Sequence, residues 1–285
     1  MDAEKETITQ EQEQQWIAQA KGGNREALER LVEQVRDPVF GLAVRMLYTP
    51  EDAQDATQEI LIKVITHLAQ FRGESRFTTW VYRIAANYLS GERKRSNVEH
   101  MISFEGFAEQ FEAGKALERD PSYTGPEAVL LEEEMKLTCT GAMLMCLDRG
   151  HRLAFTLGRI LDLPDKQVAA ILEITESTYR KRLSRAHKRL SEFMNDRCGL
   201  VNPANPCRCN KRVEAAIHFG FVNPKQPLFA NNRGRRNPTY QHFRQIGHLK
   251  RSVEVYRSHP EYMAPESMVG FVQNLISQKG FSMEV

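Results

Sequence analysis

The feature that most constrains the fold of this chain is a pair of helical patterns over residues 163–194. Apolar residues recur every three or four positions in both halves, and a short turn at 173–175 separates them. The second half holds six Lys or Arg within 174–190, opposite an apolar stripe made by Tyr179, Leu183, Ala186 and Leu190. A period of 3.6 residues predicts two helices that pack through their apolar sides.

A short basic helix of this kind has two interpretations. It is a solvated charged helix, or the second helix of a helix-turn-helix that enters the major groove of DNA. Its Arg and Lys would then neutralise phosphates, and Arg would contact guanine. The preceding amphipathic helix and the short turn favour DNA. Thr175 or Ser177 is expected to cap the basic helix. Glu173 stands where many such turns use glycine, because the chain there favours positive φ.

Composition supports a mostly helical, intracellular protein. Helical periodicity is frequent over the 285 residues, strand signals are scarce, and the fold class is expected to be all-α. The net charge of +2 hides an uneven distribution, with −8 over 97–134 and +9 over 208–257, which suggests a nucleic-acid partner. No signal peptide or membrane span is evident, and five cysteines suggest a reducing cytoplasm.

Turn and cap signals divide the chain into helices. A helix pair over 11–35 breaks at 21–24, Asn24 caps its second member, and a new helix is expected near Pro38. Further helices are predicted at 51–69, where Thr49 is the cap, and at 80–95, 127–146, 150–161 and 265–278. The last one carries an apolar side formed by Met268, Phe271, Val272, Leu275 and Ile276. The acidic stretch 96–126 interrupts the helical pattern and is predicted to be a linker.

Two surfaces of the N-terminal half carry chemistry. Asp52, Asp55 and Glu59 lie three and four residues apart, on the polar side of one helix. Trp80, Arg83 and Asn87 share one side of another helix, next to a loop with Phe71 and Phe77. Aromatic rings beside cations suit the stacking of single-stranded bases. The alternative is that these aromatic residues only form core.

The run "PEDAQDATQEILIKVITHLAQFRGESRFTTWVYRIAANYLSGERKR" at 50–95 resembles region 2 of the extracytoplasmic-function (ECF) bacterial sigma factors. Residues 147–194 resemble region 4 of the same group. Ala86 and Gly91 depart from the residues common in the family, so an unusual −10 preference is expected. The implied organisation is region 2 at 11–95, an acidic linker at 96–126, region 4 at 127–194 and a C-terminal extension at 195–285.

The resemblance implies a role for each surface. Core RNA polymerase docking falls to Asp52, Asp55, Gln58 and Glu59. Recognition of the melted −10 promoter element falls to Phe77, Trp80, Arg83, Asn87, Arg93, Lys94 and Arg95. Recognition of the −35 element falls to Ser177, Thr178, Arg180, Lys181, Arg182, Ser184, Arg185 and Lys188. The partners implied are core polymerase, promoter DNA and, as a further candidate, an anti-sigma factor.

Cysteines cluster in the extension. Cys198, Cys207 and Cys209, followed by His218, are the ligand types of a tetrahedral zinc site, although their spacing matches no standard zinc finger. A thiol switch and unliganded cysteines are the alternatives. Cys139 and Cys146 are expected to be core. The extension is predicted to regulate, by folding back on the DNA-binding domains, with its basic charge near the acidic linker, or by meeting a partner protein.

The sequence therefore predicts a cytoplasmic sigma factor without a catalytic centre, for which no cofactor is required and zinc is an optional structural ion. One alternative is a helix-turn-helix regulator that binds duplex DNA without polymerase, but such a protein needs no acidic docking face. The other is a metal hydrolase centred on Cys198 to His218, for which only Glu214 is a nearby carboxylate.

Overall fold

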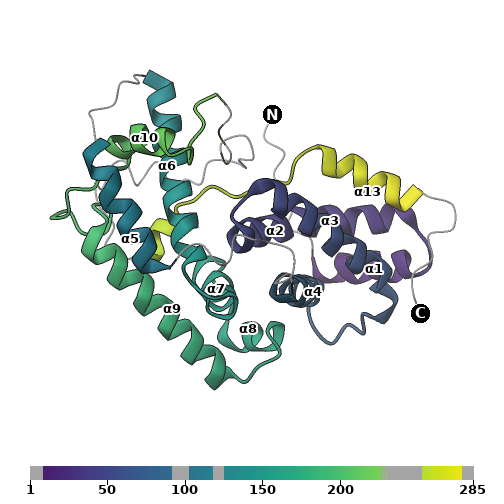
Figure 1. Cartoon of the computed structure of the whole chain (residues 1–285). Coiled ribbons are helices and arrows are strands. Elements are labelled where there is room, and N and C mark those ends of the chain that lie inside the picture. The colour runs from purple at the N-terminus through teal and green to yellow at the C-terminus, as the bar shows by residue number, and fades with distance from the viewer. Residues whose placement is uncertain are drawn as a thin grey trace.

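The computed structural model of the chain describes residues 9–91, 103–117, 125–225, 227, 229 and 252–277. These residues form helices joined by turns, with no β-strand among them, which confirms the all-α prediction. The helices gather into two groups, one from the N-terminal third of the chain and one from its middle (Figure 1). Most of the buried apolar residues form a cluster that continues from the first group into the second, and a smaller cluster lies between α6 and the extension.

The N-terminal group consists of α1 (Gln10–Lys21), α2 (Arg25–Leu47), α3 (Pro50–Thr66), a 3₁₀ turn (Leu68–Gln70) and α4 (Phe77–Gly91). The break between α1 and α2 lies where the sequence predicts it, with Gly23 at φ 90°. Asn24 caps α2 by accepting a hydrogen bond from the backbone N–H of Ala27 at 3.0 Å. Thr49 caps α3 in the same way, as expected, through the N–H of Asp52.

Helix α2 runs on through Pro38, whereas the sequence predicted a new helix near that residue. A proline inside a helix removes one backbone hydrogen bond and costs about 3 kcal/mol. Val35, Val39 and Phe40, on both sides of Pro38, are all buried in the core. Their burial, at about 1.5–3 kcal/mol for each side chain, outweighs the local cost and keeps the helix continuous.

Helix α4 begins at Phe77, three residues before the start that its polar loop suggested. The ring of Phe77 is buried, with its centroid 5.8 Å from that of Phe71 and 5.8 Å from that of Trp80. Aromatic packing of this kind adds about 0.5–1.5 kcal/mol per pair to the burial of the rings. The first turn of α4 is therefore fixed by the core and not by a side-chain cap.

The second group consists of α5 (Phe104–Ala113), a 3₁₀ turn (Gly114–Leu117), α6 (Gly125–Met145), α7 (Arg149–Phe155), a π-helical turn (Thr156–Ile160), α8 (Asp165–Ile171) and α9 (Glu176–Arg197). Helix α5 lies within the stretch that the sequence assigned to a linker. The rings of Phe104 and Phe107 each lie 5.5 Å from that of Phe193 on α9. This contact between residues far apart in sequence orders a segment that shows no clear helical pattern.

The helix-turn-helix is formed by α8 and α9, as predicted. The apolar stripe of α9 is buried, and it consists of Tyr179, Leu183, Ala186 and Leu190. Glu173 adopts φ 53° in the turn, the left-handed conformation expected there. Of the two expected caps, Thr175 is the one used, and its hydroxyl accepts a hydrogen bond from the N–H of Thr178 at 3.2 Å.

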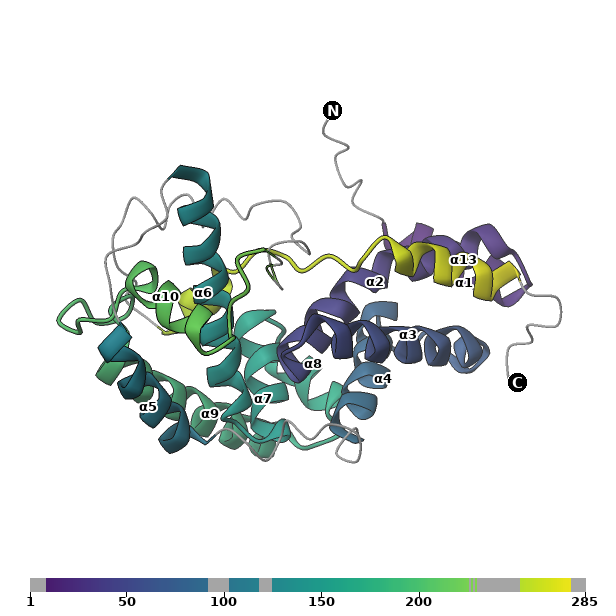
Figure 2. The ribbon, with the colours of Figure 1, turned by 45° about the horizontal axis from the view of Figure 1, so that its top comes forward.

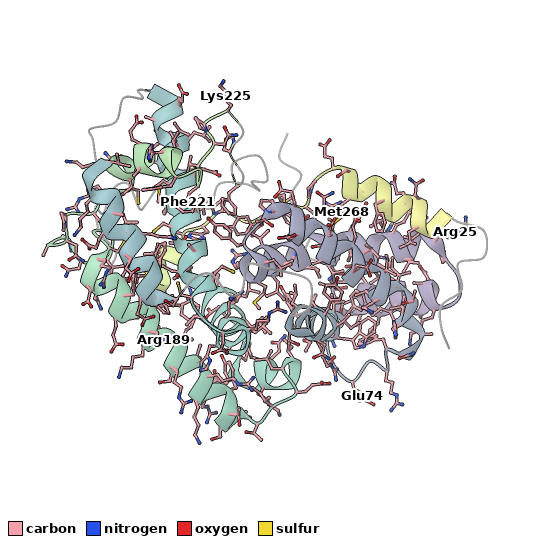
Figure 3. The ribbon with its side chains drawn as sticks, viewed as in Figure 1. Arg25, Glu74, Arg189, Phe221, Lys225 and Met268 are labelled. Carbon is pink, nitrogen blue, oxygen red and sulfur yellow. The ribbon has the colours of Figure 1, made fainter. Side chains whose placement is uncertain are left out.

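The extension contributes α10 (Cys209–His218), α12 (Ser252–Arg257) and α13 (Ser267–Ser277). Helix α10 packs on α6 and α12 packs on α9, whereas α13 packs on α2 and α3 in the other group. Residues 258–266, here called the strap, connect α12 to α13 and cross from one group to the other (Figures 1 and 2). The predicted apolar side of the last helix is confirmed, since Met268, Val272 and Ile276 are buried (Figure 3).

In the part of the chain that the structure describes, no helix is both long enough and apolar enough to serve as a membrane span.

Candidate nucleic-acid interface

Helix α9 turns its cationic side toward solvent. The exposed residues of the predicted −35 set are Ser177, Thr178, Arg180, Lys181, Ser184, Arg185 and Lys188. Arg182 differs, because its side chain is half-buried and lies beside Gly150 of α7. The surface available to a DNA groove is therefore the predicted one without Arg182.

Arg180 is held by two carboxylates at the N-terminal end of this surface. Its Nε lies 3.0 Å from Oδ2 of Asp165, and its Nη2 lies 2.7 Å from Oε2 of Glu176. The hydrogen bond with Asp165 and the charge of Glu176 raise the pKa of Arg180, so its charge is secure. The three side chains are exposed, and exposed pairs contribute only about 0–1 kcal/mol. A guanine edge or a phosphate therefore competes with them at little cost.

An open cleft of about 350 Å³ lies between α4 and the loop that precedes it. The helical side of the cleft is lined by Trp80, Arg83 and Asn87. Its loop side includes Arg72 and Glu74, and the position of Glu74 is marked in Figure 3. Trp80 and Arg83 are half-buried, and Asn87 is exposed. The cleft thus joins a stacking surface, a cation and an amide, the groups that hold an unpaired base and its backbone.

Phe77, which the sequence grouped with the −10 residues, is not on this cleft. Its ring is buried and stacks on Trp80 at 5.8 Å, with 29° between the ring planes. In this structure Phe77 supports Trp80 from beneath instead of facing solvent. Arg93, Lys94 and Arg95, the other members of the predicted set, lie outside the described residues.

The predicted polymerase-docking residues lie on the outer side of α3. Asp52, Asp55 and Glu59 are exposed, and Gln58 is half-buried. Helix α13 lies against the neighbouring side of α3, where the Nε2 of Gln54 donates to the hydroxyl of Ser267 at 3.3 Å. The acidic face is accessible while α13 occupies the surface next to it.

The two helix groups touch each other directly. Nε2 of Gln167 on α8 donates to the hydroxyl of Thr79 on α4 at 2.8 Å. Arg149 donates to the carbonyl oxygen of Leu89, the last buried residue of α4, at 2.9 Å. Arg152 is buried and donates to carbonyl oxygens on both sides of the junction, including those of Met46 and Leu147. The groups are therefore closed on each other, face to face.

The cysteines and His218 do not come together as the sequence grouped them. Cys198, Cys207 and Cys209 line one apolar pocket, but His218 is exposed at the opposite end of α10. His218 lies nine positions after Cys209 on α10, which corresponds to a rise of about 13.5 Å along the helix axis at 1.5 Å per residue. Cys146 is buried in the core, as predicted, and Cys139 packs against the core while it also lines this pocket. As placed, no three or more His, Cys, Asp or Glu in the described ranges form a metal-binding group.

Several residues that fix the closed arrangement were missed by the sequence interpretation. Tyr262 of the strap packs under Arg45 of α2, with the guanidinium carbon 4.6 Å from the ring centroid. His259 is buried beside Thr140, and the backbone N–H of Ala264 donates to Asp37 at 3.2 Å. No local pattern marks these residues. For Arg152, the sequence signal is that it directly precedes the apolar run "LAF".

Two stretches of the chain match models of known protein families. Residues 31–97 match the family model Sigma-70 region 2, and residues 137–190 match Sigma-70, region 4. Over 190 residues the chain is 32% identical to the RNA polymerase sigma-H factor of Pseudomonas aeruginosa, a match that covers 66% of this chain and 96% of that protein. It is 33% identical over 177 residues to the ECF RNA polymerase sigma-E factor of Escherichia coli, covering 60% of this chain and 88% of that protein.

Among solved structures, the chain is similar to CnrH in a complex with the cytosolic domain of CnrY. That match has a TM-score of 0.46 and 22% identity, and it covers 65% of this chain and 97% of that chain. The two family models and the curated relatives define the class of the chain as a transcription-initiation protein. The chain belongs to the ECF group of RNA polymerase sigma factors. Its C-terminal region extends beyond these relatives.

Proposed function

We propose that the three surfaces divide the work of promoter recognition as follows. The exposed carboxylates Asp52, Asp55 and Glu59 dock on a basic surface of core polymerase, because charge complementarity speeds and orients association. The cleft at Trp80, Arg83 and Asn87 holds unpaired bases of the −10 element. The outer side of α9 reads the −35 element. The observation that carries this proposal is the open cleft, in which ring, cation and amide converge.

The test of this proposal is run-off transcription with reconstituted polymerase, followed by mapping of the genomic sites that the chain directs. Trp80→Ala should weaken promoter opening, since one base–aromatic stack is worth about 1–3 kcal/mol. Arg72→Ala, at the loop side of the same cleft, separates loss of stacking from loss of charge. Full promoter opening by Trp80→Ala would remove the cleft from the mechanism.

The chain is proposed to act without a catalytic centre, since its role is to bind polymerase and DNA. It acts in the cytoplasm, where bacterial polymerase meets the chromosome. Promoter recognition by the surfaces above uses no cofactor. The zinc prediction concerned only the extension, and with His218 at the far end of α10 its thiols are the remaining candidate ligands.

We further propose that the extension regulates the sigma factor by holding it closed. The −10 and −35 elements lie about 25 base pairs apart, or about 85 Å at 3.4 Å per step. In this structure α4 and α8 are joined by the 2.8 Å bond between Thr79 and Gln167. The two groups must therefore separate before both elements are read at once.

The strap opposes that separation, because it is anchored in both groups. His259 of the strap and Tyr256 of the preceding α12 bond to Thr140 on α6, while Tyr262 and Ala264 of the strap contact α2. Helix α13 then packs on α2 and α3 beside the docking face. Release of α13 would free the N-terminal group. An anti-sigma factor is a further candidate partner, which would restrain the same two groups from outside.

Run-off transcription by the full chain tests this regulatory role. A variant that detaches α13 should transcribe more at limiting polymerase than the native chain does. Equal transcription by the two, with α13 shown to be detached, would mean that the extension does not regulate.

The alternative in which basic charge pairs with the acidic linker falls largely on residues outside the described ranges. One contact of this type is described, where Arg212 of α10 donates to the carbonyl oxygen of Phe111 on α5 at 2.7 Å and lies over the Phe111 ring. It anchors α10 on the linker helix through a carbonyl oxygen and a ring.

A further inference from the structure

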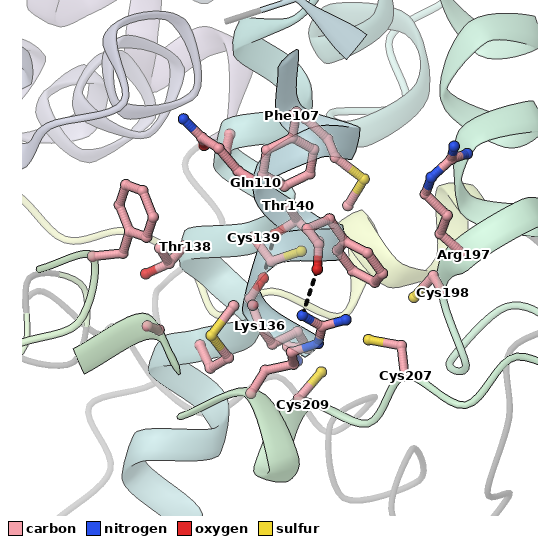
Figure 4. Close-up of a pocket in the computed structure, with 18 of the residues that line it drawn as sticks. Phe107, Gln110, Lys136, Thr138, Cys139, Thr140, Arg197, Cys198, Cys207 and Cys209 are labelled. Atoms are coloured by element: carbon pink, nitrogen blue, oxygen red, sulfur yellow. Dashed lines mark hydrogen bonds between the residues drawn. The ribbon is translucent and has the colours of Figure 1, made fainter. Parts of the chain in front are cut away.

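Four of the five cysteines line one apolar pocket at the junction of region 4 and the extension (Figure 4). Cys139 comes from α6, Cys198 from the end of α9, Cys207 from the loop before α10, and Cys209 from the first turn of α10. The cavity has a volume of about 140 Å³. Residues 70 positions apart in sequence are thus brought to one site, and Cys139 belongs to region 4 while Cys207 and Cys209 belong to the extension.

The turn after α9 is built around the sulfur of Cys198. Burial raises the pKa of the Cys198 thiol, whereas the backbone N–H groups of Leu200 and Val201, bonded to the sulfur, lower it. The turn therefore directs two backbone N–H groups at the Cys198 sulfur and fixes its position at the pocket.

Gly199 allows the two cysteine-bearing segments to approach each other. A Cβ atom at Gly199 would lie 2.1 Å from the carbonyl oxygen of Cys207 and 2.0 Å from Nη1 of Arg208. No side chain fits in that space, and a backbone oxygen cannot move aside as a flexible side chain does. The close approach of Cys207 to the Cys198 turn is therefore a built feature of the loop.

The loop itself is ordered by its polar side chains. Asn202 and Asn205 donate to the carbonyl oxygen of Asn195 at 3.0 and 2.8 Å, and Arg208 donates to the carbonyl oxygens of Pro203, Asn205 and Cys207. These hydrogen bonds order the loop and position Cys198 and Cys207 at the pocket.

Positive charge surrounds the thiols. Lys136, Arg197 and Arg212 line the same pocket as the four thiols. Four thiolates around a divalent ion carry a net charge of −2. Three cations at the edge of an apolar pocket are suited to offset that charge.

We propose that Cys139, Cys198, Cys207 and Cys209 form a tetrathiolate site for a thiophilic divalent ion of the zinc type. Thiolate ligands select zinc and similar soft ions, and closed four-ligand sites are structural. Binding replaces four S–H bonds with four metal–sulfur bonds and releases four protons, with no change of oxidation state. The thiols as described are not yet at ligand distances, so binding draws them into the cavity between them.

The site would tie α10 and the loop to α6, across the boundary between the extension and region 4. Its regulatory consequence rests on the proposed role of the extension, because a bound ion would stiffen the base from which the strap departs. The site itself does not depend on that role, since it is defined by the thiols, the Cys198 turn and Gly199.

The test uses the reduced, chelator-treated full-length chain titrated with Cd²⁺, observed by thiolate-to-cadmium charge-transfer absorption. We expect one ion per chain and release of four protons. Cys139→Ser and Cys207→Ser should each weaken binding by more than about tenfold, since even outer-sphere changes cost about 10–100-fold. Cys146→Ser, at the residue that follows the end of α6, and His218→Ala are the matched controls and should bind as the native chain does.

Binding of Cys139→Ser with native affinity would overturn the proposal, as would cadmium binding without thiolate absorption. The proposal would also be overturned if the chain took up no metal and mild oxidation with peroxide converted these thiols to disulfides, with loss of two hydrogens for each disulfide formed. Thermal unfolding of each variant without metal shows whether weaker binding is caused by a loss of folded structure. Cys207→Ser is the safer variant in this respect, because Cys207 lies in a loop and not in a helix. Because the readout is metal binding, it stands apart from any effect on transcription.

Discussion

Docking of α13 on the N-terminal group depends on a few buried side chains, and Met268 is the sharpest place to perturb it. The Met268 side chain has no exposed surface, while Val272 and Ile276 are 4% and 3% exposed. Replacement of a buried Met by Ala costs about 2–5 kcal/mol. We expect a value near the lower end of this range, because Met268 lies at the edge of the molecule, where neighbouring side chains can move into the space that it leaves. A cost of about 2 kcal/mol raises the fraction of chains with α13 detached by about 30-fold.

Hydrogen exchange followed by mass spectrometry measures this shift. In Met268→Ala the amides of α13 should exchange about 30-fold faster, while those of α2 and α9 keep their native rates, because detachment is local. Gly270→Ala is the matched control in the opposite direction. Gly270 is exposed with nothing within 4 Å of an added Cβ, so alanine should gain about 1 kcal/mol of helix stability and slow exchange about fivefold.

The same two variants separate docking from regulation. Run-off transcription at limiting polymerase should rise for Met268→Ala and fall for Gly270→Ala. Unchanged exchange in α13 of Met268→Ala would refute the packing argument itself. Faster exchange with unchanged transcription would keep the packing and remove the regulatory role.

Four further predictions follow from particular residues. The double variant Asp55→Arg with Glu59→Arg should lose binding to core polymerase in a pull-down while its circular dichroism is unchanged, because both side chains are exposed; retained binding would sink the docking assignment. Arg180→Ala should lower run-off transcription and alter the −35 preference by about 1–3 kcal/mol at one base, whereas an equal loss on all sequences would mean that Arg180 contacts only phosphate. Glu173→Gly should raise the free energy of unfolding by about 1 kcal/mol in urea titrations, since Glu173 adopts φ 53°; no gain would mean that the turn is unstrained. Burial, with Lys136 and Arg45 nearby, holds the pKa of His259 well below its usual range. The unfolded chain then takes up a proton near pH 6.5 that the folded chain refuses, so stability should fall as pH drops below about 6.5, by up to about 1.4 kcal/mol per pH unit, and His259→Gln should reduce that acid dependence; an identical slope in both proteins would contradict the argument.

Much of this architecture is determined by short-range sequence signals. Asn24, Thr49 and Thr175 mark helix starts because their side chains bond backbone N–H groups within three residues, a relation that sequence alone expresses. The basic side of α9 and the acidic side of α3 follow from a spacing of three and four residues on one helix. These local relations were enough to predict the helix-turn-helix and the exposed acidic face of α3, whereas the sigma-factor family was indicated by a resemblance of whole sequence runs.

The remaining features depend on contacts between residues far apart in the chain, which no local pattern records. Helix α5 is ordered by the stacking of Phe104 and Phe107 on Phe193, and α2 continues past Pro38 because its neighbours bury both sides of that residue. Phe77 looked like a DNA contact until its ring was seen beneath Trp80.

The extension shows most clearly which features follow from local sequence signals and which depend on contacts between distant residues. Its final amphipathic helix was readable from the spacing of Met268, Val272 and Ile276, because a 3.6-residue period is a local property. The surface that this helix covers, and the meeting of Cys139 with Cys198, Cys207 and Cys209, were decided only when tertiary packing brought distant segments together. A period in the sequence shows that a helix has an apolar side, but the partner of that side is chosen by the burial of the whole chain.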